Sequence, residues 1–443
     1  MQGAPSRSET SAAPVPRRSR GIVGILIVAV ALAAGIALAA KAVFADPAPS
    51  ERADLESRLR QGGSGATPSA LLEGLDLRRA RSRDGALEAD LADGRRAKLT
   101  LDPDLQRAVK RLLARYELPY ASVVAMEPTT GRVLAYVSHS SANPSAPDLA
   151  LDGSPPAASV FKIVTGSALV DAGVDPDARV CYGGGFNRLE LADLEENQSR
   201  DRWCSSLAGA MGSSINAIFA RLALRHLTPQ TLGRYARAFG FGEAIPFDLP
   251  TRANDATVPE DRLEFARTSA GFWHMHLSPL HGAVLGSTIA SRGLMLRPQI
   301  IDEVRAADGS LLHRSTPVLV RRVLAEQSAR IVNRMMRRTV TEGTSRRTFF
   351  DPQGVAFLPG IEIAGKTGTL NGSNPFRGYT WWVGFAPADA PRIALAVLVV
   401  NTPIWRVKAN FVARETLRAF FGAHPVHGAA DAGVHATDAG VRR

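Results

Sequence analysis

A serine and a lysine three residues apart, Ser159 and Lys162, place the strongest restriction on how this 443-residue chain can fold. From Ser159 to Ala172 apolar residues recur at helical spacing, and the run ends at Gly173, which predicts a helix. Residues i and i+3 share one face of a helix, so we expect the Lys162 amine to lie beside the Ser159 hydroxyl. This arrangement is typical of a serine nucleophile with its base one turn away, although such a pair also arises by chance.

Lysine is rare in this chain, which makes its positions informative. Only six of the 53 basic residues are lysines, and these are residues 41, 98, 110, 162, 366 and 408. Arginine stays protonated in proteins, whereas a lysine that is shielded from water and lies near another cation can lose its proton. Of the two strongly basic residue types, only lysine can therefore serve as a base at position 162.

Two later motifs follow the first in a specific order. They are Ser214-Ile215-Asn216 and Lys366-Thr367-Gly368-Thr369. Together with Ser159-x-x-Lys162 they match the set Ser-x-x-Lys, Ser-x-Asn and Lys-Thr-Gly of penicillin-binding proteins and class A β-lactamases. Residues from about 102 to 421 resemble the transpeptidase domain of penicillin-binding proteins. The resemblance includes further stretches at residues 102–106, 155–158, 342–344 and 364–365.

Each later motif also has a purely structural interpretation. Asn216 precedes a helical run over residues 217–226, so it could be an N-cap, and Ser213 or Ser214 could satisfy loop backbone groups. The Lys-Thr-Gly run could be the edge of a hairpin. The order of the three motifs favours the catalytic interpretation, and the usual spacing in the family favours Ser214 over Ser213.

The resemblance implies catalytic roles for three residues. Ser159 would attack the substrate carbonyl, Lys162 would accept its proton, and Ser214 would relay a proton toward the leaving amine. The backbone N–H groups of Ser159 and Thr369 would form the oxyanion hole.

The resemblance also implies substrate-binding roles. Asn216 would hold the substrate amide, Lys366 would add positive potential near Lys162, and the Thr367 and Thr369 hydroxyls would bind a terminal carboxylate. A Lys-Thr-Gly strand exposes backbone to an extended peptide, and Gly368 is expected to let that peptide approach closely.

The implied reaction is crosslinking of peptidoglycan stem peptides through a Ser159 acyl-enzyme, with β-lactams as inhibitors that acylate the same serine. Neither a metal nor an organic cofactor is implied. Two alternatives stay open: a serine β-lactamase or D,D-carboxypeptidase, and a non-catalytic β-lactam sensor or scaffold. A lactamase would need a deacylating base, for which Glu260 and Glu264 lie in a plausible interval without the class A surroundings.

The N-terminal sequence predicts a single membrane crossing. Residues 21–40 form an apolar run, and twenty residues of helix span roughly the 30 Å core of a bilayer. Arginines at positions 17, 18 and 20 precede the run, which predicts a cytoplasmic N-terminus and an extracytoplasmic catalytic domain at the inner (cytoplasmic) membrane. Residues 43–45 resemble a signal-peptide cleavage site, but the length of the run favours an uncleaved anchor.

Composition divides the chain into five segments. We expect a cytoplasmic tail at 1–20, a transmembrane anchor at 21–44, a polar linker at 45–98, a transpeptidase domain at 99–421, and a disordered tail at 422–443. The linker is too short for the glycosyltransferase domain or the large pedestal that many relatives carry.

The predicted fold is α/β (α+β). Apolar patterning predicts strands near residues 121–127, 132–138, 361–370, 379–385 and 393–400, and terminal helices near 102–116 and 407–421. By resemblance, these elements form a five-stranded antiparallel sheet flanked by helices, with an inserted, mostly helical lobe, behind a single N-terminal transmembrane helix.

Cysteine content and net charge bear on whether the chain contains a disulfide and on which partners it could bind. Cys181 and Cys204 are the only cysteines, and an extracytoplasmic location makes a disulfide the expected use of them. The net charge of +11 would suit nucleic acid, but the predicted topology argues against that partner and favours anionic lipids or cell-wall polymers. Cell-wall synthesis or division proteins are further candidate partners.

One stretch departs from the family pattern. Residues 269–273, Ser-Ala-Gly-Phe-Trp, stand where the family usually has a Gly-Gln-Gly-like segment. We expect this change to narrow or reshape the cleft.

Overall fold

The computed structural model describes residues 65–185, 188–373 and 375–425. The predicted cytoplasmic tail and membrane anchor, residues 45–64 of the predicted linker, and residues 426–443 of the predicted tail lie outside these ranges. In the part of the chain that the structure describes, no helix is both long enough and apolar enough to cross a bilayer.

The central element is a five-stranded antiparallel sheet in the order β12-β13-β14-β4-β5. Its strands are β4 (Tyr120–Met126), β5 (Val133–His139), β12 (Ala364–Ser373), β13 (Phe376–Ala386) and β14 (Ile393–Asn401). All five match predicted strands, so the sheet prediction is confirmed. β12, which carries the Lys-Thr-Gly motif, lies at one edge.

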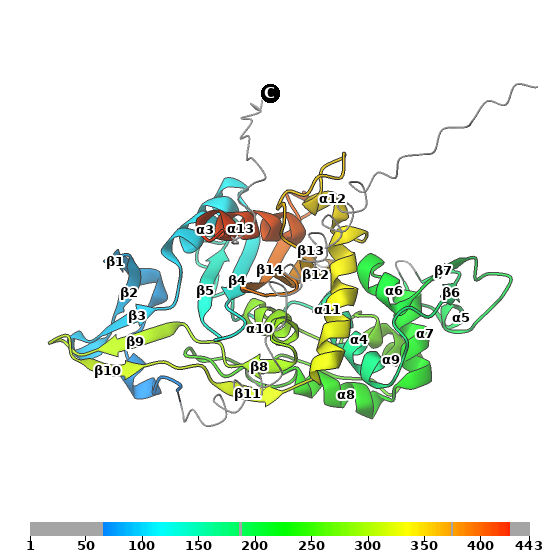
Figure 1. The fold of residues 1–443 in the computed structure, drawn as a ribbon, viewed down its shortest axis with the longest axis horizontal. Coiled ribbons are helices and arrows are strands. Elements are labelled where there is room, and N and C mark those ends of the chain that lie inside the picture. The colour runs from blue at the N-terminus through cyan, green and yellow to red at the C-terminus, as the bar shows by residue number, and fades with distance from the viewer. Residues whose placement is uncertain (1–64, 186–187, 374, 426–443) are drawn as a thin grey trace, which may run out of the picture. The chain divides into compact units, whose positions relative to one another are not determined.

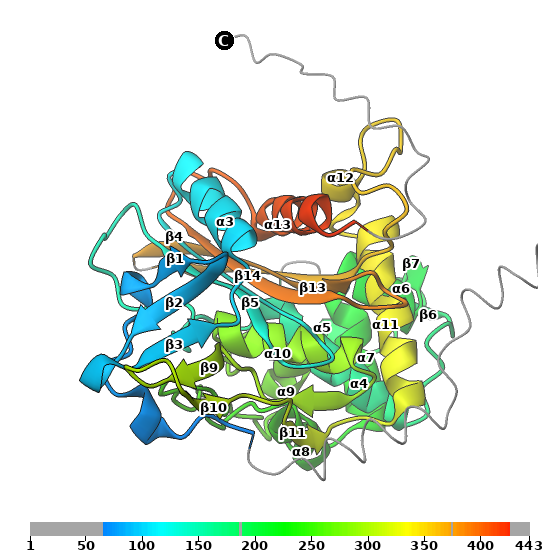
Figure 2. The same ribbon diagram turned by 60° about the vertical axis from the view of Figure 1, so that its left-hand side comes forward.

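The sheet is buried on both faces, and its middle strand shows this most clearly. Every residue of β14 is buried, and successive side chains alternate between two hydrophobic cores. One core lies under the terminal helices α3 (Pro103–Arg115) and α13 (Ala409–Ala423), and the other lies under α10 (Pro279–Ala290) (Figures 1 and 2). Burial on both sides explains why this strand is a continuous apolar run in the sequence.

A mostly helical lobe is inserted between β5 and β12, as predicted (Figure 1). It contains the turn η4 (Ala158–Phe161) and the helices α4 (Lys162–Asp171), α5 (Leu191–Leu194), α6 (Leu207–Ser213), α7 (Asn216–His226), α8 (Pro229–Ala238), α9 (Arg262–Ser269), α11 (Glu326–Thr341) and α12 (Arg346–Phe349). This part of the chain also contains two two-stranded antiparallel sheets, β6 (Val180–Tyr182) with β7 (Trp203–Ser205) and β8 (Leu294–Leu296) with β11 (Leu319–Arg322).

The prediction of a polar linker is wrong for residues 65–98. This segment forms the turns η1 (Ser69–Leu72), η2 (Leu77–Arg79) and η3 (Ala92–Gly94), and three strands of a second antiparallel sheet, β1 (Arg81–Arg83), β2 (Ala86–Asp90) and β3 (Arg96–Leu99). The sheet is completed by β9 (Ile301–Arg305) and β10 (Leu311–Arg314). β3 pairs with β9, a strand two hundred residues away, and the local sequence pattern could not reveal that pairing.

The predicted disordered tail also begins too early. Helix α13 continues to Ala423, and the ring of His424 lies 2.7 Å from Asp102 Oδ2. The same Asp102 caps α3 by accepting hydrogen bonds from the N–H groups of Asp104 and Leu105. These contacts order residues 422–425.

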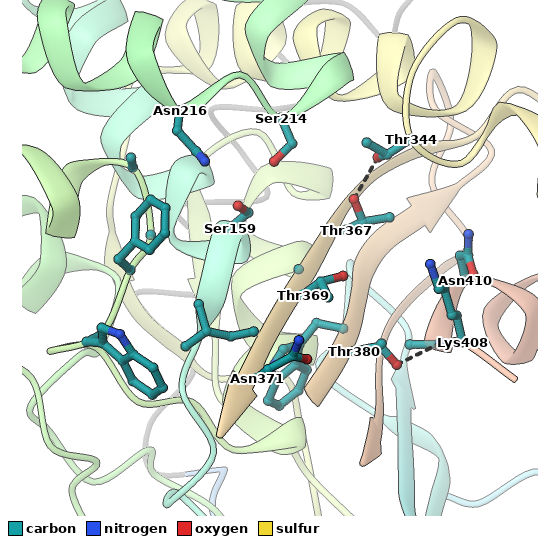
Figure 3. Close-up of a pocket in the computed structure, with 18 of the residues that line it drawn as sticks. Ser159, Ser214, Asn216, Thr344, Thr367, Thr369, Asn371, Thr380, Lys408 and Asn410 are labelled. Carbon is teal, nitrogen blue, oxygen red and sulfur yellow. Dashed lines mark hydrogen bonds between the residues drawn. The ribbon is translucent and has the colours of Figure 1, made fainter. Parts of the chain in front are cut away.

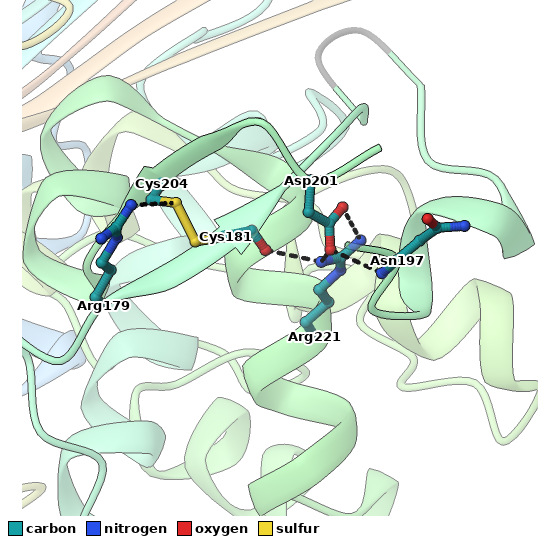
Figure 4. Close-up of a disulfide and its surroundings, with 6 residues drawn as sticks. All are labelled: Arg179, Cys181, Asn197, Asp201, Cys204 and Arg221. Atoms are coloured by element: carbon teal, nitrogen blue, oxygen red, sulfur yellow. Dashed lines mark hydrogen bonds and ion pairs between the residues drawn. A yellow bond between two sulfur atoms is a disulfide. The ribbon is translucent and has the colours of Figure 1, made fainter. Parts of the chain in front are cut away.

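The disulfide between Cys181 and Cys204 joins β6 to β7, where the two residues are paired in register (Figure 4). In the chain-entropy model, closing a loop of this size stabilises the fold by about 3 kcal/mol.

A buried arginine, Arg221, attaches the β6–β7 region to α7. Arg221 pairs with both carboxylate oxygens of Asp201, at 2.6 and 3.1 Å, and donates to the Cys181 carbonyl (Figure 4). Its remaining donors reach the carbonyls of Asp193 and Glu195. Because α7 also carries Asn216 of the second motif, the contacts of Arg221 help to fix the position of Asn216.

We expect Arg221→Leu to lower the free energy of unfolding by about 3–5 kcal/mol, since it leaves the buried Asp201 carboxylate without its partner. Urea denaturation checks this. Arg225→Leu is the matched control, because Arg225 lies on the same helix and pairs with Glu196 at the surface, where such pairs contribute about 0–1 kcal/mol. Equal losses in the two variants would contradict the assignment.

Candidate active site

The first motif lies at the entry of the helical lobe. Ser159 belongs to η4, a 3₁₀ turn that continues directly into α4 at Lys162, so the predicted helix is present with a tighter first turn. The turn is held against the sheet, because the Trp381 indole N–H donates to the carbonyl of Pro156 at 2.9 Å. The serine is thereby fixed beside β12.

Lys162 and Ser159 are in hydrogen-bonding contact, as the spacing predicts. Lys162 Nζ lies 2.9 Å from Ser159 Oγ, 2.7 Å from Asn216 Oδ1 and 2.6 Å from the Ala270 carbonyl oxygen. The lysine is completely buried. This burial, with a smaller contribution from the charge of Lys366, lowers the pKa of Lys162 well below its usual value. A neutral amine beside a hydroxyl is suited to accept its proton.

The second motif lies between α6 and α7. Ser214 is the C-cap of α6 and adopts the left-handed conformation, with φ of 59°, while Ser213 is exposed on the last turn of that helix. Asn216 is the first residue of α7, its N-cap is Ile215, and its side chain turns to Lys162. Asn216 is therefore not an N-cap, and of the two serines it is Ser214 whose hydroxyl contacts Lys366.

The third motif brings a second buried lysine to the same place. Lys366 Nζ donates to Ser214 Oγ and to the Thr367 carbonyl, each at 2.9 Å. Burial lowers the pKa of Lys366 to about 7. The structure thus links the motifs as two lysine–serine pairs, Lys162 with Ser159 and Lys366 with Ser214.

Gly368 has a structural reason within the fold as well as its expected role toward a peptide. A Cβ atom at this position would lie 3.2 Å from the Cβ of Ala158 and 3.3 Å from the carbonyl oxygen of Ala157. The glycine therefore lets β12 pack against the turn that carries Ser159.

The three motifs line a cleft of about 850 Å³ with Ser159, Ser214, Asn216 and residues 367–369 (Figure 3). Ser159, Ser214 and Asn216 face β12 across it, and Thr367 and Thr369 project from β12. None of the described lining residues is a carboxylate, and the charged ones are Arg188 and Lys408. The chemistry of the lining suits a substrate with negatively charged groups.

Several lining residues were not predicted. Thr344 contacts Thr367 through their hydroxyls at 2.6 Å, and its Glu-Gly-Thr stretch was a sequence signal without an assigned role. The others carry no local signal, because they come from segments far apart in the chain: Arg188, Asn371, Thr380, Lys408 and Asn410. Residues 270–273, where the sequence departs from the family pattern, also line the cleft.

The candidate deacylating carboxylates do not line the cleft. Glu264 pairs with His274 at 2.9 Å and with Arg267 at 2.7 Å, contacts that lower the pKa of its carboxyl group. Glu260 accepts a long hydrogen bond from Gln230. Neither is placed to activate water beside Ser159.

The depressed pKa of Lys366 predicts a pH dependence of stability. Between about pH 7 and the value of 10.5 for an ordinary lysine, the unfolded chain binds one more proton here than the folded chain does. Raising the pH across this range therefore favours the folded state by about 1.4 kcal/mol per unit. Lys366→Met removes this titrating group. Between about pH 7.5 and 9.5, the rise in its free energy of unfolding should therefore be smaller than the wild-type rise by roughly 2–3 kcal/mol. Urea denaturation at the two pH values measures both rises, and identical rises would contradict the assignment.

Comparison with known proteins agrees with this geometry. A family profile described as the penicillin binding protein transpeptidase domain matches residues 121–421. Peptidoglycan D,D-transpeptidase PbpA of Mycobacterium tuberculosis is 28% identical over 337 residues, which cover 68% of this chain and 66% of PbpA. Penicillin-binding protein PbpB of Mycolicibacterium smegmatis is 28% identical over 342 residues, covering 70% of this chain and 51% of PbpB.

A solved structure is similar as well. The imipenem acyl-enzyme complex of penicillin-binding protein A from M. tuberculosis aligns with a TM-score of 0.60 and 26% identity, over 73% of this chain and 79% of that one. The chain spans between about half and just under two thirds of the length of the two curated relatives. The matched profile covers most of the chain, and the three motifs lie within it. This chain therefore belongs to the penicillin-binding protein transpeptidase family.

Proposed function

We propose that this protein is a peptidoglycan D,D-transpeptidase that forms an acyl-enzyme at Ser159. The observation that carries the proposal is the 2.9 Å contact between Ser159 Oγ and the buried, depressed-pKa amine of Lys162. The family membership supports it, as do the activity named for the relative PbpA and the acyl-enzyme reported for penicillin-binding protein A.

In the proposed acylation, Ser159 Oγ attacks the carbonyl carbon of the penultimate D-alanine while Lys162 Nζ takes the hydroxyl proton. The tetrahedral oxyanion is stabilised by the backbone N–H groups of Ser159 and Thr369. The C–N bond then breaks, and the proton reaches the departing D-alanine amine through Ser214, which Lys366 holds in place. The Thr367 and Thr369 hydroxyls bind the carboxylate of that D-alanine.

In the second half of the reaction, an amine of a neighbouring stem peptide attacks the acyl carbon, and Lys162 takes a proton from that amine. The bond between the acyl carbon and Ser159 Oγ then breaks, and Lys162 returns a proton to the Ser159 oxygen. Water as the acceptor would make the same protein a D,D-carboxypeptidase. The chemistry needs only side chains and backbone of this chain. We further propose that residues 21–44 anchor the protein in the inner membrane, with the cleft outside the cytoplasm.

Fluorescent penicillin tests the acyl-enzyme directly. We expect the full-length protein to form a stable covalent adduct, visible after denaturing electrophoresis, and Ser159→Ala to form none, because the drug's carbonyl acylates the same oxygen. Rapid turnover of the drug would favour the β-lactamase. If the wild type forms no adduct, the protein is a scaffold; if Ser159→Ala is labelled, the nucleophile is elsewhere.

The two adjacent serines provide a matched pair for the second motif. We expect Ser214→Ala to slow acylation by about 10²–10⁴-fold, since a positioned proton-transfer group contributes that much. Ser213→Ala should stay within about twofold of the wild type, because its side chain is exposed on the last turn of α6 and does not line the cleft. Stopped-flow measurement of the acylation rate of each variant tests this. A larger loss of rate in Ser213→Ala than in Ser214→Ala would contradict the role of Ser214 in the mechanism.

A further inference from the structure

The C-terminal end of α9 points at the amine of Lys162. This helix ends in a Schellman motif: the N–H of Phe272 bonds to the carbonyl of Arg267 at 2.9 Å, and the N–H of Gly271 bonds to that of Thr268 at 2.8 Å. Gly271 has φ of 83°, the left-handed conformation that this motif requires. The motif satisfies two helix-end carbonyls, and the Ala270 carbonyl, which follows them, accepts from Lys162 instead.

The three partners of Lys162 differ in what they can do. The Ala270 carbonyl and Asn216 Oδ1 can only accept hydrogen bonds, whereas the Ser159 hydroxyl can accept or donate. A neutral amine has two N–H bonds and one lone pair. With both N–H bonds directed to the two acceptors, the lone pair is left facing the proton of Ser159.

We propose that the C-terminal end of α9, acting through the Ala270 carbonyl, orients the lone pair of Lys162 toward Ser159 and stabilises the ammonium that forms when the proton is transferred. The carbonyl end of a helix carries partial negative charge, which favours a cation there. This inference rests on the proposed function and adds Gly271 and Ala270 to it as positioning residues.

The other groups around Lys162 do not substitute for this carbonyl. Lys366 on β12 is the charged side chain that acts on it, and its charge opposes the ammonium. The Phe219 ring of α7 lies 5.5 Å from Nζ and favours the cation weakly. Asn216 supplies the second acceptor.

Gly271 is what allows the carbonyl to come so close. A Cβ at this position would lie 2.4 Å from the Ala158 carbonyl oxygen and 2.9 Å from Ser159 Cα, so any larger residue forces the end of α9 away from the serine. Gly173 is a matched position elsewhere: its φ is 81°, and an added Cβ there meets nothing within 4 Å.

The test measures the acylation rate by fluorescent penicillin from about pH 5 to 9 in wild type, Gly271→Ala and Gly173→Ala. We expect Gly271→Ala to lower the plateau rate by about 10–100-fold, the usual effect of misplacing a catalytic group by an ångström. In the plot of acylation rate against pH, the rising part should move to lower pH in Gly271→Ala. The reason is that the Lys162 ammonium has lost a hydrogen-bond acceptor, which lowers its pKa. Gly173→Ala carries the same backbone strain and should keep the wild-type rate and profile.

Ala270→Gly is a second variant that adds no atoms and loosens the same carbonyl, and it should show the same two changes at smaller size. Thermal unfolding of every variant separates a change in the site from a loss of the fold. An unmoved rising part in both Gly271→Ala and Ala270→Gly overturns the inference, even where the plateau falls. Labelling that does not need Ser159 would instead overturn the proposed function, so the two failures can be distinguished.

Discussion

The rest of the site depends on the burial of two lysine amines that, among the residues the structure describes, have no carboxylate partner at hydrogen-bonding distance. Lys162 and Lys366 are both fully shielded from water, and their nitrogens contact hydroxyl, amide and carbonyl oxygens. Burying an ammonium ion without a counter-ion costs free energy, so burial lowers the pKa of both amines. The same burial that opposes folding near neutral pH thus makes a lysine act as a base.

This requirement explains why the cleft lies where the helical lobe meets the sheet. Shielding Lys162 takes groups from η4, α7 and the end of α9, and shielding Lys366 takes β12 and the loop before α7. No single element could exclude water from both amines. Gly368 lets β12 pack closely against the η4 turn, and Gly271 does the same for the end of α9. The same close packing therefore brings the catalytic groups together.

Local signals predicted much of this arrangement. The Ser159–Lys162 contact follows from helical spacing alone, and the five strands follow from apolar runs and turns, because each depends on neighbours in sequence. The pairing of β3 with β9 could not be predicted, since β9 lies far along the chain, but the Asp84-Gly85 turn that joins β1 to β2 was a local hairpin signal that was missed. The Ala270 carbonyl was also missed, because a backbone oxygen has no signature in the sequence. Gly271 was visible, but only as part of a stretch that departs from the family pattern.

The lining of the cleft bears on what happens to an acyl group once it forms. Hydrolysis needs a base that activates water, and among the described lining residues there is no carboxylate to do so. Glu264, the best candidate by position in the chain, is paired with His274 and Arg267, which stabilise its ionised form outside the cleft. Without such a carboxylate, Lys162 is the base at hand beside Ser159, and an acceptor amine and water would both depend on it for deprotonation. The balance between transfer and hydrolysis then depends on which acceptor the cleft admits to the acyl carbon.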